Sequence, residues 1–155
     1  MFYAGWDFKS KRPRNMDGFR QGIGLAVSTD LIHWRKPAEF GKNGLAPKGS
    51  DQCVVRDESH DRWLLYVGRS GAVAVYQSED LYHWTGAGLA LGEADLKTGN
   101  TDMNPGESPF VMKHPLSGKW IIFVNGGYSV SADPFKFPPV TPYPFKSGLF
   151  KFASA

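Results

Sequence analysis

A repeat of about fifty residues constrains this chain more than any other feature of its sequence. The heptapeptide STDLIHW at 28–34 recurs as SEDLYHW at 78–84 and, in degenerate form, as SADPFKF at 131–137. A second series interleaves with it: MFYAG at 1–5, WLLYVG at 63–68 and WIIFVNG at 120–126, the first two aligned on Gly5 and Gly68. Short apolar runs and turns repeated at this period are typical of structural units that stack on one another.

The composition favours strands and turns over helices. The 155 residues include 18 glycines and 11 prolines, 14% are aromatic, and no long stretch keeps an apolar period of 3.6 residues. We therefore predict an all-β fold, a single partial β-propeller domain of about two and a half blades. The expected divisions are a first-blade remainder at 1–45, a second blade at 46–95, a third at 96–140 and a connector at 141–155.

Several classes of function find no support in the sequence. The net charge of +3 is too small to indicate a nucleic-acid partner, and the basic run at 9–14 contains Pro13 and is typical of a solvated loop. No segment has the length and hydropathy of a signal peptide or membrane span. Cys53 has no cysteine to pair with, and neither His33 nor His83 has a second ligand at a metal-binding spacing. We expect no metal and no cofactor.

The repeat singles out two acidic residues. Asp51 lies twelve residues before Trp63, and Glu107 lies thirteen residues before Trp120, each just upstream of an apolar strand. The innermost strands of a propeller line its central channel, so equivalent positions on successive blades converge there. Two carboxylates at the mouth of a cleft are what glycoside hydrolysis requires, one to protonate the leaving oxygen and one in its ionised form.

The repeated segments, taken in order, resemble one group of enzymes. They are FYAG, GIGLAVSTDLIHW, DQCVV with RWLLYVGR, AVAVYQSEDLYHW, and NPGESPFV with GKWIIFVNG. In this order and spacing they are similar to about half of the five-bladed β-propeller glycosidase domain of glycoside hydrolase families 32, 43, 62 and 68. The resemblance implies a carbohydrate substrate, a furanoside or pyranoside such as a fructoside, arabinoside or xyloside.

The resemblance also implies roles for the acids. Such enzymes carry an acid on each of the first three blades: a nucleophile or base, a transition-state stabiliser, and a general acid. By position, Asp51 matches the second and Glu107 the third. The first-blade acid would precede Met1, so we expect the isolated chain to hydrolyse little. The second-blade motif departs from the usual Arg-Asp-Pro, and the nearby Arg56-Asp57 falls in the following hairpin turn, so we prefer Asp51 to Asp57.

Other residues beside these strands are candidates for contact with a sugar, although a plain loop role fits several of them equally well. They are Trp6, Asp7, Gln52, Arg69, Ser108 and Asn125.

A second hypothesis makes the chain a non-catalytic module. A half-propeller exposes strand edges and an apolar blade face, which favour carbohydrate binding or pairing with another chain. Two copies would together supply about five blades, so a homodimer completing the ring is one expectation. A truncated fragment without a role of its own is the third hypothesis.

Overall fold

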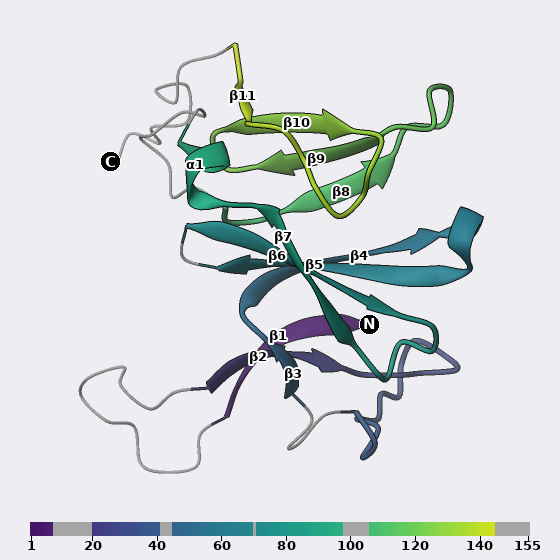
Figure 1. Ribbon diagram of the computed structural model, residues 1–155. Coiled ribbons are helices and arrows are strands. Elements are labelled where there is room, and N and C mark those ends of the chain that lie inside the picture. The colour runs from purple at the N-terminus through teal and green to yellow at the C-terminus, as the bar shows by residue number, and fades with distance from the viewer. Residues whose placement is uncertain (8–19, 41–44, 70, 98–105, 145–155) are drawn as a thin grey trace, which may run out of the picture.

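The computed structural model describes residues 1–7, 20–40, 45–69, 71–97 and 106–144 as three antiparallel sheets stacked in chain order (Figure 1). The first sheet contains β1 (Phe2–Asp7), β2 (Arg20–Leu25) and β3 (Leu45–Lys48). The second contains β4 (Ser50–Asp57), β5 (Arg62–Arg69), β6 (Ala72–Ser78) and β7 (Thr85–Leu91). The third contains β8 (Phe110–Lys113), β9 (Trp120–Val124), β10 (Gly127–Ser131) and β11 (Thr141–Pro142). The predicted all-β, blade-like architecture is confirmed.

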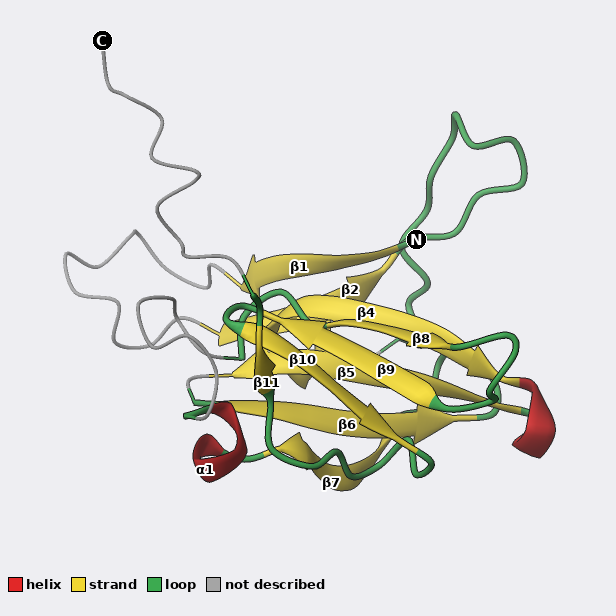
Figure 2. Ribbon diagram, turned by 90° about the horizontal axis from the view of Figure 1, so that it is seen from above, coloured by secondary structure: helices red, strands yellow, loops and turns green. Residues whose placement is uncertain are grey.

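Strand order within each sheet follows chain order, as in propeller blades. β3 belongs to the first sheet and β11 to the third, so these sheets extend to Lys48 and Pro142, a few residues past the divisions expected at 45 and 140. Two short helical segments accompany the second sheet, α1 (Glu93–Leu96) and a 3-10 turn (Glu58–His60). Figure 2 shows them at opposite ends of the strands.

The sequence of β5 explains why the second sheet lies in the middle of the stack. Successive side chains of a strand point to opposite faces of the sheet. Leu64 and Tyr66 are fully buried in the cluster shared with the third sheet, whereas Leu65 and Val67 are fully buried in the cluster shared with the first. Because both faces are covered, the strand is a continuous apolar run rather than an alternating one.

Specific contacts join the second and third sheets. The Tyr66 hydroxyl donates a hydrogen bond to the Pro134 carbonyl at 2.8 Å, and burial raises the pKa of this hydroxyl well above its usual range. The Cys53 sulfur of β4 accepts from the Val111 amide of β8 at 3.2 Å, and burial raises the pKa of its thiol. These contacts hold the second sheet against β8 and against the turn after β10, since each links a side chain of the second sheet to a backbone group of the third unit.

The heptapeptide repeat forms the same turn at each of its first two occurrences. In the second, the Ser78 hydroxyl accepts from the Leu81 amide at 2.9 Å, and Asp80 Oδ1 accepts from the His83 amide at 2.8 Å. The Trp84 indole donates to the Leu81 carbonyl at 3.0 Å. The turn at 28–34 repeats these bonds at 2.8, 2.8 and 3.2 Å. The repeated aspartates therefore shape the turns, as Asx-type turns do.

The strand registers correct one alignment made from sequence. β1 pairs Phe2 with Leu25, and β5 pairs Tyr66 with Val75. Leu25 and Val75 each lie three residues before the serine of their turn, so Phe2 occupies the position of Tyr66. The alignment of Gly5 with Gly68 is therefore wrong by one residue, because a shared glycine is a weaker marker than the pairing of neighbouring strands.

The inter-sheet hydrogen bond of Tyr66 can be tested directly. Tyr66→Phe should lower the free energy of unfolding by about 1 kcal/mol, because it leaves the buried Pro134 carbonyl without its donor. Urea denaturation measures the change. Tyr82→Phe, which removes a hydroxyl from an outer turn, is the matched control and should change the free energy little. Equal stability of the Tyr66 variant and the native protein would contradict this assignment.

The turns also predict a pH dependence. The imidazole of His33 and the backbone amides hold the pKa of Asp30 well below its usual range, and His83 does the same for Asp80. Because both carboxyl groups titrate lower when folded, their contribution to stability is complete above the pKa of the unfolded chain and is lost as pH falls through the folded pKa. NMR titration of the carboxyl carbons should show both groups still ionised at about pH 3.

His33→Ala provides the internal control for this titration. It should raise the pKa of Asp30 toward the ordinary value and leave Asp80 unchanged, since the His33 ring binds Asp30 at 2.7 Å, whereas Asp80 is bound by His83. A titration of Asp30 that is unaffected by removal of His33 would refute the stated cause.

Candidate functional site

The segments that carry the two predicted acids lie together at one end of the second and third sheets. Asp51 lies near the start of β4, and Glu107 lies just before β8, the neighbouring first strand of the next sheet. The Ser108 amide donates a hydrogen bond to Asp51 Oδ2 at 3.3 Å. Asp51 thus binds the backbone next to Glu107, across 57 residues of sequence.

The backbone geometry around the acids is unusual. Asp51 has a φ of 52° and lies at an irregularity of the β4–β5 pairing, between Ser50 and Gln52. Ser108 has the same φ, 52°, and like Asp51 it lies twelve residues before the tryptophan of its unit. Left-handed backbone at a residue other than glycine is uncommon and marks a local constraint. Because this conformation recurs at Ser108, Ser108 is the structural counterpart of Asp51. Glu107 lies one residue upstream of that position.

Asn125 contacts Glu107 twice. Its side-chain amide donates to Glu107 Oε2 at 3.4 Å, and its backbone amide donates to the Glu107 carbonyl at 3.2 Å. Both residues are partly buried. Asn125, a candidate for contact with a sugar, thus orients the carboxylate from the end of β9.

Two glycines bring the strands close enough for these contacts. A Cβ at Gly68 would lie 2.9 Å from the Gly106 carbonyl and 3.5 Å from Asp51 Cβ. Gly106 has a φ of 83°, and a Cβ there would lie 3.0 Å from the Ala72 carbonyl. Sequence reasoning assigned no role to these glycines, although a glycine at the end of the apolar run in β5 is a recognised signal of close backbone approach.

The other candidates for sugar contact have varied surroundings. Gln52 donates from its side chain to the Phe2 carbonyl at 3.1 Å and so ties the second sheet to the first. Arg69 is exposed and contacts the hydroxyl and ring of Tyr76. Trp6 and Asp7 belong to the last part of β1, but their side chains lie outside the described residues. Asp51, Glu107, Ser108 and Asn125 are therefore the candidates that the structure brings together.

Asp57, the alternative second-blade acid, is the last residue of β4, at the opposite end from Asp51, and not part of the hairpin turn in which the sequence placed it. It is buried and binds Arg62 Nε at 3.0 Å and His60 Nδ1 at 2.9 Å. This pairing accounts for its burial in structural terms, since a buried carboxylate requires a partner.

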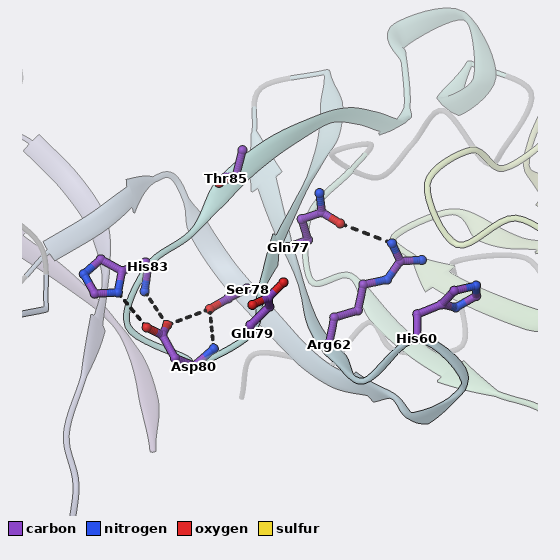
Figure 3. A pocket seen from close by; sticks show the side chains of 8 residues that line it. All are labelled: His60, Arg62, Gln77, Ser78, Glu79, Asp80, His83 and Thr85. Atoms are coloured by element: carbon purple, nitrogen blue, oxygen red, sulfur yellow. Dashed lines mark hydrogen bonds and ion pairs between the residues drawn. The ribbon is translucent and has the colours of Figure 1, made fainter.

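A hollow of about 400 Å³ lies at that same far end of the second sheet and is shown in Figure 3. Half of its lining residues belong to the heptapeptide turn, and the others come from the 3-10 turn, β5, β6 and β7 around it. The lining residues are His60, Arg62, Gln77, Ser78, Glu79, Asp80, His83 and Thr85. Across the described ranges, no group of three metal-ligating side chains gathers at either end. No described helix has the length and hydropathy to span a membrane.

The close approach at Gly68 generates a prediction. Gly68→Ala should lower the free energy of unfolding by about 1–3 kcal/mol, because the added methyl group collides with the Gly106 backbone. It should also shift the amide resonance of Ser108, which reports the bond to Asp51. Denaturation and NMR measure the two effects.

Gly86→Ala is the matched control for this substitution. A Cβ there would lie 3.7 Å from the Tyr76 ring, an ordinary contact. If the two alanine variants were equally stable and gave the same Ser108 resonance, the proposed close approach would be wrong.

Comparison with known proteins gives two kinds of relative. No family model matches the chain. A levanase of a Bacillus species is 30% identical over 135 residues, which cover 77% of this chain and 14% of the levanase. A probable sucrose-6-phosphate hydrolase of Psychromonas ingrahamii is 39% identical over 69 residues, covering 39% of this chain and 12% of that protein. The chain thus matches only about one-seventh of the length of these relatives or less.

Solved structures show the same fold. A GH32 β-fructofuranosidase of Bombyx mori superposes with a TM-score of 0.62 and 20% identity, covering 88% of this chain and 32% of that one. An exo-β-1,3-galactanase of Clostridium thermocellum gives a TM-score of 0.53 and 21% identity, covering 67% and 26%. The three sheets therefore have the arrangement of successive blades in these larger proteins.

Proposed function

We propose that this chain, which forms part of a glycoside hydrolase β-propeller domain, takes part in the hydrolysis of β-fructofuranosides such as sucrose. The observation that carries the proposal is the bond of 3.3 Å between Asp51 and the Ser108 amide, because it joins the two candidate acids' segments at one end of adjacent sheets. The choice of sugar is supported by two relatives, a probable sucrose-6-phosphate hydrolase that is similar in sequence and a β-fructofuranosidase that is similar in fold.

In the proposed mechanism Glu107 is the general acid. Its carboxyl group gives a proton to the glycosidic oxygen as the bond from that oxygen to the anomeric carbon breaks. Asn125 holds the Glu107 side chain through Oε2, which fixes the direction of the proton donor. The geometry limits the rotation of the acid, so less entropy is lost when the sugar binds.

Asp51 is proposed to stabilise positive charge on the sugar ring. An ionised carboxylate close to a developing oxocarbenium ion lowers its energy. Asp51 is held by the Ser108 amide and by its own left-handed backbone, both of which limit its movement. A further carboxylate, as nucleophile or general base, is needed to complete hydrolysis, and no described residue is assigned that role.

Binding and turnover should be measured separately on the native chain. Sucrose should shift the NMR resonances of Asp51, Glu107 and Asn125 in a saturable way. Any hydrolysis should fall by about 100-fold or more in Glu107→Gln, because that variant cannot donate the proton. Aryl glycosides of arabinose and xylose, tested in parallel, determine whether the preference is for fructosides.

Glu79→Gln is the control, since it neutralises an exposed acid at the far end of the same sheet. It should change neither the sugar-dependent shifts nor the rate. Sugar binding at these residues without turnover would favour a non-catalytic carbohydrate-binding module. The proposal would be refuted if none of the sugars bound, or if turnover persisted in Glu107→Gln.

A further inference from the structure

The hollow at the far end of the second sheet takes no part in the proposed hydrolysis. Its volume of about 400 Å³ lies within the range of sites that bind small molecules. The second sheet shares a buried cluster with a neighbour on each side, so the hollow does not belong to an outer face of the stack. Its polar lining is therefore a feature of the best-supported part of the fold.

One buried carboxylate holds two of the nitrogen-bearing side chains that line the hollow. Asp57 Oδ2 binds Arg62 Nε at 3.0 Å and His60 Nδ1 at 2.9 Å. The Asp57 side chain is only 2% exposed, whereas that of His60 is 62% exposed. Because Asp57 occupies Nδ1 of the imidazole, the other ring nitrogen, Nε2, is left for a ligand.

The guanidinium group of Arg62 is fixed by further contacts. Its Nη1 donates to Gln77 Oε1 at 3.2 Å, and its central carbon lies 4.6 Å from the ring centroid of Phe135 in the third unit. Within the described part of the chain, Arg62 Nη2 and Gln77 Nε2 have no hydrogen-bond partner. These N–H groups are held in place before a ligand arrives, so binding loses little side-chain entropy.

The heptapeptide turn forms the other wall of the hollow and carries negative charge. Figure 3 shows Glu79 and Asp80 on one side and Arg62 and His60 on the other. Asp80 stays ionised because His83 and the backbone amides stabilise its charged form, which holds its pKa well below the usual range. Carboxylates only accept hydrogen bonds, whereas the N–H groups of the first wall only donate them.

The two walls together restrict the chemistry of a ligand. An anion is repelled by the carboxylates and cannot donate to them. An ammonium group is repelled by Arg62 and has no acceptor for the N–H groups of the first wall. A neutral molecule with hydroxyl groups satisfies both walls, because each hydroxyl donates one hydrogen bond and accepts others.

We propose that this hollow is a second carbohydrate site, which binds one neutral sugar unit through Arg62, His60 and Gln77. The hydroxyl oxygens of the sugar accept from these three side chains, and its hydroxyl hydrogens point toward the opposite wall. Asp57 is a positioning residue, because it orients Arg62 and His60 without facing the ligand.

The second site is separate from the candidate acids. Asp57 follows Asp51 by six residues on β4, which corresponds to about 20 Å along a strand. A sugar unit in the hollow therefore cannot contact Asp51 or Glu107. Binding there attaches the protein to carbohydrate without turnover, so this proposal does not depend on the proposed hydrolysis.

NMR titration of the 155-residue chain tests the site, with sucrose as the probe. The side-chain N–H resonances of Arg62 and Gln77 should shift and saturate at millimolar sucrose. Glucuronate and glucosamine present the same kind of ring with a negative and a positive charge. Each should bind at these residues about fivefold more weakly than sucrose, because one wall of the hollow repels it.

Two substitutions remove one donor each. His60→Ala and Gln77→Ala should each weaken the binding of sucrose in the hollow by about fivefold, since each deletes a hydrogen bond to the sugar. Glu58→Ala is the matched control, because Glu58 is exposed in the same 3-10 turn as His60 but does not line the hollow. It should leave the affinity unchanged, and circular dichroism should show that all variants are folded.

The outcomes for the two sites are read from different residues. If Arg62 and Gln77 do not respond to sucrose, the second site is overturned, even where Asp51 and Glu107 respond. Binding of a charged sugar as tight as that of sucrose overturns it too, as does binding that both substitutions leave unchanged. Saturable shifts confined to the hollow support the second site and count against the proposed hydrolysis.

Discussion

The burial of both faces of the second sheet is the constraint on which the rest of the structure depends. Leu64 and Tyr66 cover one face of β5, and Leu65 and Val67 cover the other. A sheet of this kind has no face for solvent, so it requires a neighbour on each side. The first and third sheets supply those neighbours, and their packing brings the starts of β4 and β8 together. The position of the candidate site therefore follows from that packing.

Much of the fold could be predicted from the sequence, because segments that recur along the chain form the same local structure each time. The turns at 28–34 and 78–84 share the serine, aspartate, histidine and tryptophan that make their hydrogen bonds, so the resemblance between them reflects a physical requirement. The alignment at Gly5 failed because strand pairing, which involves residues distant in sequence, determines the register. Local spacing says little about such pairing.

The site was predictable only in outline. The spacing of Asp51 and Glu107 indicated two acids at one end of adjacent sheets and already differed by one residue, but it could not show the backbone conformation at either position. The left-handed backbone recurs at Asp51 and Ser108, so the structure matches Ser108, and not Glu107, to Asp51. The contact of Asn125 with Glu107 was also not predictable, because it depends on how the end of β9 lies against the segment before β8.

The sulfur of Cys53 lies between the second and third sheets and accepts a hydrogen bond from the Val111 amide. Burial raises the pKa of this thiol, so the reactive thiolate is scarce while the sheets remain packed. Local separation of the two sheets would expose this partly buried cysteine further and favour its alkylation. The rate at which Cys53 reacts with a small electrophile therefore reports how often the junction between the second and third sheets opens, on a timescale that stability measurements do not resolve.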